Sequence, residues 1–463
     1  KSNPVRVDSH PDLWHVEPTV DVSTVINVAV FAAANQKLGV LGLAAALSLS
    51  VAACSKGGGG QATTNSTAGA SGPVELSMWT HNAGNKEELA AITSVVTDFN
   101  ASQAKYQVKL QSFPQDSYNQ SVTSAAAAKK LPCILDIDQP NVANWAWAGY
   151  LAPIEGLDDT LSKFLPSTVA KYDGKTYAYG YYDVSLVWVT RASILKKYGI
   201  RTPTIDQPWT QDEFMAAMKK VKDSGDYKFP ADLATGWTGE WWPYGFSPQL
   251  QSFGGDLMSR PDYKSAQGVL NGDKAIAWAN WFADMAKQGY MPKKSSSDPS
   301  QDFMNGKSAF LWNGSWTAVP TRKKFNDVVF APPVDFGNGP KVGGGSWTWG
   351  ASTNCSDPAG AAEYLKFAAA DKYVAKVAQD TNNIPATDAA AAMVPAFAPG
   401  GENDVFRQYS KKFTVLRPET PGYPFIATEF EKAAKDILNG ADPKTALDQA
   451  VSNIDSNQQQ YVS

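Results

Sequence analysis

From residue 74 onward, the hydrophobic and polar positions follow regular patterns. Two stretches alternate apolar and polar residues as half-buried strands do, a third is a short apolar run, and segments with helical spacing separate them. The predicted order is strand 74–79, helix 86–99, strand 106–110, helix 117–130 and strand 134–138. Strands that alternate with helices favour a parallel sheet with right-handed crossovers, and hence an α/β fold.

A second series of elements follows this unit. Residues 186–189 predict a strand, and Thr210 is placed to cap a helix that runs to Lys222. The other predicted elements are helices at 271–289, 363–379 and 425–438, and Gly- and Pro-rich loops near 243–261, 331–346 and 395–401. The helix at 271–289 carries one apolar stripe, which favours core packing over a ligand site. The stripe consists of Trp278, Trp281, Phe282 and Met285.

The segment before residue 74 predicts export. Lys37 is followed by LGVLGLAAALSLSVAAC, a charge and then an apolar run that ends in small residues, as in a signal peptide. The end of this run, Val51-Ala52-Ala53-Cys54, resembles a bacterial lipobox, which implies cleavage before Cys54 and lipidation of that residue. The alternative is a plain signal peptide that happens to meet a cysteine. We therefore expect a leader at 1–53 and a flexible Ser- and Gly-rich tether at 54–73.

Composition narrows the possible functions. The 463 residues allow two or three domains, and a net charge of -4 gives no indication of nucleic-acid binding. Only three His occur, and His81 is the only one after the leader, so a His-clustered metal site is excluded and no cofactor or metal is expected. The 15 Trp require a large core or an aromatic binding surface. Cys133 and Cys355 are either a disulfide or two buried thiols.

Three groups of short segments carry recognisable motifs. The first contains 131–137 (LPCILDI) and 148–154 (AGYLAPI). The second contains 172–177 (YDGKTY), 195–200 (LKKYGI), Pro203 and 209–214 (WTQDEF), and the third 303–310 (FMNGKSAF), 314–316 (GSW) and 343–347 (GGGSW). Their order resembles the family 1 extracellular solute-binding proteins, the maltose-binding-protein-like class, over about residues 74–463. Cys133 replaces the usual Asp, and the insert before Trp209 is longer than in the family.

The resemblance implies a two-lobed α/β fold of the periplasmic-binding-protein type (type II), with a ligand cleft between lobes. The implied bounds are 74–184 and 330–385 for lobe 1, and 185–329 and 386–463 for lobe 2. Cys133 and Cys355 then share lobe 1, which favours a disulfide. The implied protein is a monomer outside the cytoplasm, anchored to the cell membrane. It binds a mono- or oligosaccharide without catalysing a reaction, and delivers it to the permease of an ABC importer.

A sugar site needs aromatic platforms for C–H faces and polar groups for hydroxyls, and ligands of α/β sheets lie beyond the strand ends. The resemblance and the strand ends give the candidate ligand-binding residues Trp79, His81, Asn82, Asp138, Asn141, Tyr181, Asp183, Glu240, Trp241, Trp242, Trp316, Ser346, Trp347 and Arg417. The three glycines before Ser346 are expected to let backbone approach a ligand. Each Trp can equally be a packing residue, and Asp138 and Asp183 can be caps or turn residues.

Three other functions stay open at this point. The same fold can bind a glycerophosphodiester or another phosphorylated solute, although a phosphate needs more clustered bases than Arg417 alone. A glycoside hydrolase would use Glu240 with Asp138 or Asp183. A lectin-like adhesin would have shallow sites and no hinge.

Overall fold

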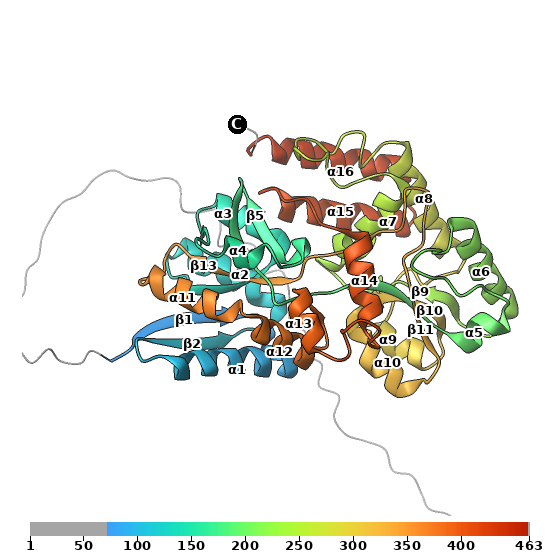
Figure 1. Cartoon of the computed structure of the whole chain (residues 1–463). Coiled ribbons are helices and arrows are strands. Elements are labelled where there is room, and N and C mark those ends of the chain that lie inside the picture. The colour runs from blue at the N-terminus through green and yellow to red at the C-terminus, as the bar shows by residue number, and fades with distance from the viewer. Residues whose placement is uncertain (1–71, 462–463) are drawn as a thin grey trace, which may run out of the picture. The chain divides into compact units, whose positions relative to one another are not determined.

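Residues 72–461 are described by a computed structural model, and they build two large β-sheets with helices around each (Figure 1). We call the sheet that contains β1 with its helices lobe 1, and the sheet that contains β8 with its helices lobe 2. This arrangement confirms the predicted α/β class. The predicted leader, Cys54 and nearly all of the tether lie outside the described residues. In 72–461, no helix has the length and apolar character needed to span a membrane.

The lobe 1 sheet has the strand order β2-β1-β3-β13-β6-β5, with β4 beside β13. Its strands are β1 (Val74–Thr80), β2 (Tyr106–Ser112), β3 (Ile134–Asp138), β4 (Leu151–Ala152), β5 (Val169–Tyr172), β6 (Lys175–Tyr179) and β13 (Trp347–Ser352). The predicted parallel unit is confirmed, because β1 pairs in parallel with both β2 and β3. The late strand β13 joins antiparallel to β3 and β6, so the whole sheet is mixed.

Helices cover both faces of this sheet. On one face, α1 (Lys86–Ser102) packs with α11 (Pro358–Ala368) and α12 (Asp371–Thr381). On the other face, α2 (Gln115–Ala127) and α3 (Val142–Trp147) bury Tyr118 and Trp145 against Leu135. Short helices complete the lobe: η2 (Asn82–Gly84), η3 (Gln139–Asn141), α4 (Asp158–Leu161), η4 (Pro166–Thr168) and α13 (Asp388–Met393).

The lobe 2 sheet has the order β11-β8-β10-β9. Its strands are β8 (Leu186–Arg191), β9 (Phe229–Asp232), β10 (Ser308–Gly314) and β11 (Val328–Ala331). Its helices are α5 (Ala192–Lys197), α6 (Gln211–Ser224), α7 (Trp241–Phe253), α8 (Asp273–Lys287), α9 (Pro299–Met304), η5 (Ser315–Thr317), α10 (Ala318–Lys324), α14 (Asp404–Phe413), α15 (Tyr423–Leu438) and α16 (Pro443–Gln458). The predicted cap is confirmed, since Thr210 and Glu213 form a reciprocal capping box at the start of α6.

Two small β-pairs lie where the chain passes between the sheets. The strand β7 (Tyr182–Asp183) pairs with β14 (Ile384–Pro385), and β12 (Val342–Gly343) pairs with β15 (Thr414–Val415). Strand β11 continues beside β8 to Ala331. The lobe bounds themselves stay predictions.

Two predicted elements are wrong. The helix expected at 363–379 is two helices, α11 and α12, because the buried positions change phase between Ala368 and Tyr373. The loop expected near 243–261 contains α7, whose residues are all buried. Pro243 lies in the first turn of α7, where its missing N–H has no intrahelical role, and Pro248 is accommodated inside the helix.

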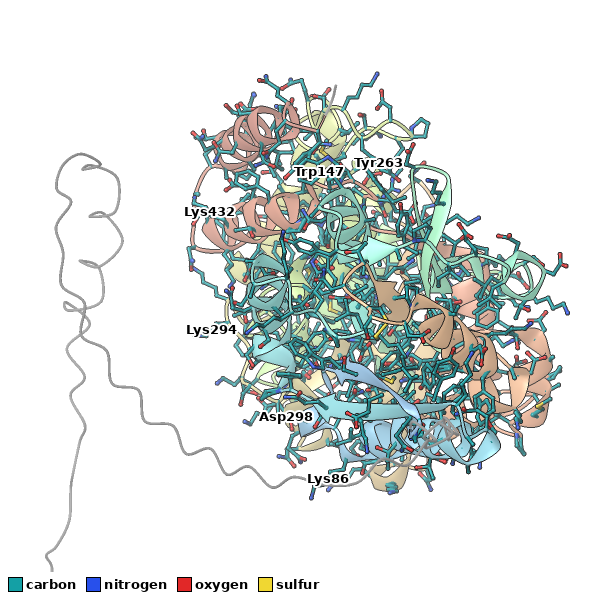
Figure 2. All side chains as sticks on the ribbon, turned by 90° about the vertical axis from the view of Figure 1, so that its left-hand side faces the viewer. Lys86, Trp147, Tyr263, Lys294, Asp298 and Lys432 are labelled. Atoms are coloured by element: carbon teal, nitrogen blue, oxygen red, sulfur yellow. A yellow bond between two sulfur atoms is a disulfide. The ribbon has the colours of Figure 1, made fainter. Side chains whose placement is uncertain are left out.

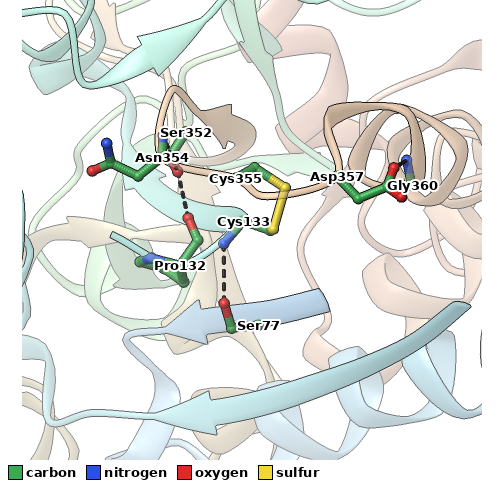
Figure 3. The surroundings of a disulfide bond; sticks show 8 residues. All are labelled: Ser77, Pro132, Cys133, Ser352, Asn354, Cys355, Asp357 and Gly360. Carbon is green, nitrogen blue, oxygen red and sulfur yellow. Dashed lines mark hydrogen bonds between the residues drawn. A yellow bond between two sulfur atoms is a disulfide. The ribbon is translucent and has the colours of Figure 1, made fainter. Parts of the chain in front are cut away.

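A disulfide joins Cys133, just before β3, to Cys355, just after β13 (Figure 3). This is the pairing that the resemblance implied. The two strands are antiparallel neighbours, so these ends of the strands meet. The main-chain N–H of Ser352 donates to the Cys133 carbonyl at 3.0 Å, and the Ser352 hydroxyl donates to the Pro132 carbonyl at 2.5 Å. The bond therefore fastens the returning segment to the first half of lobe 1.

The surface of α3 carries a half-exposed Trp. Figure 2 labels Trp147, whose side chain is 50% exposed. Its ring meets the Tyr461 ring edge-on at 4.9 Å. Asn144, also on α3, donates its side-chain N–H to the Pro421 carbonyl at 2.7 Å. These contacts tie the C-terminal segment to lobe 1.

Candidate functional site

A row of aromatic rings stands on the lobe 2 side of the junction. Trp237 and Trp241 meet edge to face at 4.7 Å, Trp241 lies 6.3 Å from Tyr244, and Tyr244 stacks with Trp316 at 6.4 Å. The Trp316 side chain is 37% exposed and lies over Gly314, where an added Cβ would be 1.9 Å from the indole. Because α7 has helical spacing, Trp241 and Tyr244 present their rings on the same side.

On the lobe 1 side, the partly exposed Trp347 begins β13 and stacks on the buried His81. The ring centroids are 3.4 Å apart and the planes differ by 9°. Asp138 ends β3 directly opposite Trp347 in the strand register. Among the described residues, no hydrogen bond reaches the half-buried Asp138 carboxylate. An indole face and an open carboxylate are therefore neighbours at this strand end.

Arg417 connects the two sides. Its side chain is only 5% exposed, and its Nε lies 2.9 Å from Glu240 Oε1, just before α7. Its Nη2 donates to the Gly345 carbonyl at 3.1 Å, and its guanidinium lies 4.9 Å above the Tyr244 ring. The Tyr423 hydroxyl also donates to Glu240, at 2.5 Å. Ring contacts link Trp316 to Tyr244 and Tyr244 to Arg417, the charge of Arg417 acts on Asp138, and Asp138 is opposite Trp347 in the strand register. We call Trp316, Tyr244, Arg417, Asp138 and Trp347 the junction set.

The charges of this region are unevenly balanced. Burial raises the pKa of Asp138, although Arg417 and His81 oppose the rise. Burial also raises the pKa of Glu240, and Arg417 offsets part of the rise. The Arg417 guanidinium is thus the nearby positive charge for both Asp138 and Glu240, whose ionised forms are disfavoured by desolvation. This arrangement disfavours a further anion.

The glycine segment at 343–345 packs against the protein itself, contrary to its predicted role of admitting a ligand. A Cβ on Gly343 would be 2.7 Å from the Tyr244 carbonyl oxygen, and one on Gly345 would be 1.7 Å from Gln139 Oε1. Pro248, four residues later in α7, has no N–H to donate to the Tyr244 carbonyl. The glycines therefore let lobe 2 side chains and η3 approach the crossing segment.

The structure places three of the predicted ligand residues in the interior. Trp242 has no exposed surface and donates its indole N–H to the Trp237 carbonyl at 2.9 Å. Tyr181 is 1% exposed and packs against Tyr179 and Trp349. The Asp183 carboxylate is fully buried and accepts four hydrogen bonds. Their donors are Ser167, Val184, Gly345 and Ser410. Asp183 thus acts as a structural link, and we leave these three out of the proposed site.

The other predicted residues lie at or beside the junction set. Asn82 is 1% exposed and neither amide atom has a protein partner. Trp241 is 7% exposed and its Nε1 is also unpartnered. Trp79 packs against Phe113 at 4.6 Å, and the Ser346 carbonyl accepts from the Gln139 N–H at 3.2 Å. Asn141 ends η3 with partial exposure.

Sequence reasoning missed Tyr244, Tyr423 and Gln139. Tyr244 lies three residues after Trp241, so helical spacing would have indicated it if the segment had been interpreted as a helix. Tyr423 begins α15, far along the chain from Glu240, and no local signal connects the two residues.

The sequence pattern of a family described as "Bacterial extracellular solute-binding protein" matches residues 94–402. The chain belongs to this family. The family comprises solute-binding proteins and not enzymes, which removes the glycoside-hydrolase alternative. The solute-binding assignment also places the protein among those that act outside the cytoplasm.

Several proteins resemble this solute-binding protein over most of its length. The diacetylchitobiose binding protein DasA of Streptomyces coelicolor is 26% identical, over 74% of this chain and 80% of the relative. The sn-glycerol-3-phosphate-binding periplasmic protein UgpB of Rhizobium meliloti is 25% identical, over 82% and 92%. The fold is similar to the GacH receptor of Streptomyces glaucescens, crystallised unliganded and with acarbose. That match has a TM-score of 0.70 and 21% identity, and covers 84% of this chain and 99% of GacH.

Proposed function

We propose that this solute-binding protein captures a neutral mono- or oligosaccharide at the junction set and delivers it to the permease of an ABC importer. The observation that carries the proposal is the pairing of ring faces and polar groups from both lobes. Trp316 contributes an exposed indole from lobe 2, while Trp347 and Asp138 contribute an indole and an open carboxylate from lobe 1. Rings match the C–H faces of a sugar, and carboxylates accept hydrogen bonds from its hydroxyls.

The solute-binding relatives differ in what their names say they bind, since one binds diacetylchitobiose and another sn-glycerol 3-phosphate. The charges favour the sugar. Arg417 is the one buried base of the junction set, and Glu240 and the Gly345 carbonyl already engage it. A phosphate would have to displace Glu240 and approach Asp138, which like-charge repulsion disfavours.

Binding is proposed to close the lobes about the crossing strands β7, β12, β14 and β15. A sugar that contacts Trp316 and Trp347 together binds the closed form more tightly than the open form. It therefore stabilises the closed form. Small-angle X-ray scattering tests this motion, and a decrease in the radius of gyration on sugar addition is the expected result. An unchanged radius at saturation would favour a shallow, lectin-like site.

The deciding experiment is isothermal titration calorimetry with a matched panel of neutral sugars and phosphorylated solutes. The panel contains N,N′-diacetylchitobiose, maltotriose, glucose, glucose 6-phosphate and sn-glycerol 3-phosphate. We expect saturable binding of a neutral member, and no binding of the phosphorylated ones. Tight binding of sn-glycerol 3-phosphate with no neutral sugar bound would reverse the assignment.

We further propose that the protein is a monomer held on the cell membrane by lipid at Cys54. The lipobox-like sequence and the tether composition support this anchor. Expression of the full chain in a bacterium fed a labelled fatty acid tests it, with Cys54→Ala as the matched variant. Label in both proteins, or in neither, contradicts the anchor. Light scattering coupled to size exclusion tests the monomer.

A further inference from the structure

The imidazole of His81 lies flat against one face of the Trp347 indole. The 3.4 Å centroid distance and 9° interplanar angle give full ring overlap. Tyr118, on α2, meets both rings edge-on, at 6.4 Å from His81 and 5.8 Å from Trp347. His81 itself is 4% exposed, so it faces the indole and not the solvent. His81 therefore packs behind the Trp347 indole of the junction set.

The orientation of His81 is fixed from behind. Its Nδ1 lies 2.6 Å from Asp136 Oδ2, which also accepts the Thr80 hydroxyl at 2.8 Å. Its Nε2 lies 3.9 Å from Glu88 Oε2, and the Tyr182 hydroxyl donates to the other oxygen of Glu88 at 2.5 Å. Asp136 is within hydrogen-bond distance of Nδ1, and Glu88 lies near Nε2 at ion-pair distance, so the surroundings favour an imidazolium. Burial raises the pKa of Glu88, while His81 and the Tyr182 hydroxyl oppose the rise.

Three elements bring titratable groups toward His81. Strand β3 brings Asp136 and Asp138, helix α1 brings Glu88, and helix α2 brings Tyr118. Burial lowers the pKa of His81, but the negative charges of Asp136, Glu88 and Asp138 outweigh burial and raise the pKa above its usual value. A charged imidazolium against an indole face is a desolvated cation–π pair.

We propose that His81 is a positioning residue for Trp347. The imidazolium, clamped by Asp136 and Glu88, holds the indole in the orientation that a sugar stacks on. The inference rests on the proposed function and adds a regulatory property to the site. When His81 loses its proton the cation–π contact is lost, Trp347 gains rotational freedom, and binding must order the ring again. Sugar affinity then falls by about tenfold as the pH rises through the His81 titration.

The first test needs no sugar. We measure the tryptophan fluorescence of the unliganded full chain from about pH 5 to about pH 10 and take the difference from Trp347→Phe, which isolates the Trp347 signal. An imidazolium in contact with indole quenches its emission, so the difference signal should rise with a midpoint above the ordinary histidine value. NMR of the His81 ring, assigned with the His81→Asn variant, should give the same midpoint. A difference signal with no such titration overturns the proposal.

The second test measures affinity for N,N′-diacetylchitobiose and maltotriose across the same pH range. Two variants separate the stack from the proton. His81→Phe keeps a ring against Trp347 without a charge, and His81→Asn keeps a donor to Asp136 without a ring. Both should bind about tenfold more weakly than the native protein at low pH and show a smaller fall in affinity over the His81 titration, because only the contribution of Asp138 and Glu240 remains. Thermal melts verify that each variant is folded.

Asp138→Asn is the matched control for the neighbouring carboxylate, because it leaves the His81 ring and its proton in place. The fluorescence titration should persist in this variant, with a lower midpoint. A fall in affinity that is as large in His81→Phe as in the native protein, or a native profile that is flat, overturns the positioning role. If neither sugar binds at any pH, the proposed sugar class fails. The fluorescence titration alone then decides whether His81 controls Trp347.

Discussion

Arg417 Nε lies 2.9 Å from Glu240 Oε1, and this ion pair stands at the junction of the two lobes. Arg417 is buried and Glu240 is 31% exposed, so the pair is only partly desolvated. Replacing Arg417 with Ala leaves Glu240 and the Gly345 carbonyl without this partner. We expect the free energy of unfolding to fall by about 2–3 kcal/mol, toward the lower end of what loss of a buried partner costs.

A double-mutant cycle with Glu240→Gln, followed by urea denaturation, measures this coupling directly. The double variant should be less destabilised than the sum of the single variants. Strict additivity would show that the two side chains do not interact in solution.

Trp316 is the aromatic residue of the junction set with the most exposed surface. We expect Trp316→Ala to weaken sugar binding by about 2 kcal/mol, or about 30-fold, because a stacking face is lost. Stability should change less than affinity, since the ring is 37% exposed and packs on Gly314 and Tyr244 at the surface. Trp147→Ala is the matched control, because Trp147 is half-exposed but lies on α3, outside the junction set. Equal affinity loss in both variants would remove Trp316 from the site.

The sequence predicts the local part of this fold well. Strand β3 has the predicted bounds, and α6 begins at the predicted cap, because alternation and capping depend on residues a few positions apart. The strand β13 could not be placed by local pattern alone, since its partners β3 and β6 lie about two hundred residues earlier. Its return to lobe 1 was expected only through the family resemblance, which implied residues 330–385 for that lobe.

In the candidate site, too, the local sequence predicts some residues, while contacts between distant residues decide the others. A predicted strand end indicated Asp138, and the glycine segment and the resemblance indicated Trp347, and these two residues lie opposite each other. Asp183 was also a candidate from its place in the chain, but its carboxylate accepts hydrogen bonds from the hydroxyls of Ser167 and Ser410. These residues are 16 and 227 positions away. Only the folded chain reveals such donors. The prediction for Trp242 was wrong because the Gly- and Pro-containing segment that follows it was interpreted as a loop. The segment belongs to α7, a fully buried helix.

The Cys133–Cys355 disulfide closes a loop of 222 residues. Cross-linking so long a loop restricts the unfolded chain, so we expect Cys133→Ala/Cys355→Ala to lose about 2–5 kcal/mol of unfolding free energy. Thermal melts of the oxidised native protein, the reduced native protein and the double variant measure the loss. The reduced protein should match the variant. An unchanged melting temperature on reduction would show that the bond does not form in the purified protein.

Gly343 provides a test of how tightly the crossing segment packs. A Cβ at this position would meet the backbone carbonyl of Tyr244, which cannot move without shifting α7. We expect Gly343→Ala to cost about 1–3 kcal/mol of stability, as overpacking does. Gly84→Ala is the control, because nothing lies within 4 Å of its added Cβ. The control should stay within about 0.5 kcal/mol of the native protein in urea denaturation. Equal losses would mean that α7 does not contact the segment in solution.

Stability should decline as the pH rises from about 6 to about 8.5. Burial lowers the pKa of His81, but its charged neighbours outweigh burial and raise it, and burial raises the pKa of Glu240 although Arg417 offsets part of the rise. A group with a raised folded-state pKa stabilises fully below its unfolded pKa and loses this contribution as the pH passes the folded value. Carboxylates with lowered pKa values, such as Glu213 at about 2, lose their contribution only in acid and do not affect this window. Urea denaturation across the window should give a falling free energy, with a smaller fall in His81→Asn and in Glu240→Gln. A rising free energy would contradict both assignments, because it requires groups that bind protons more tightly when unfolded.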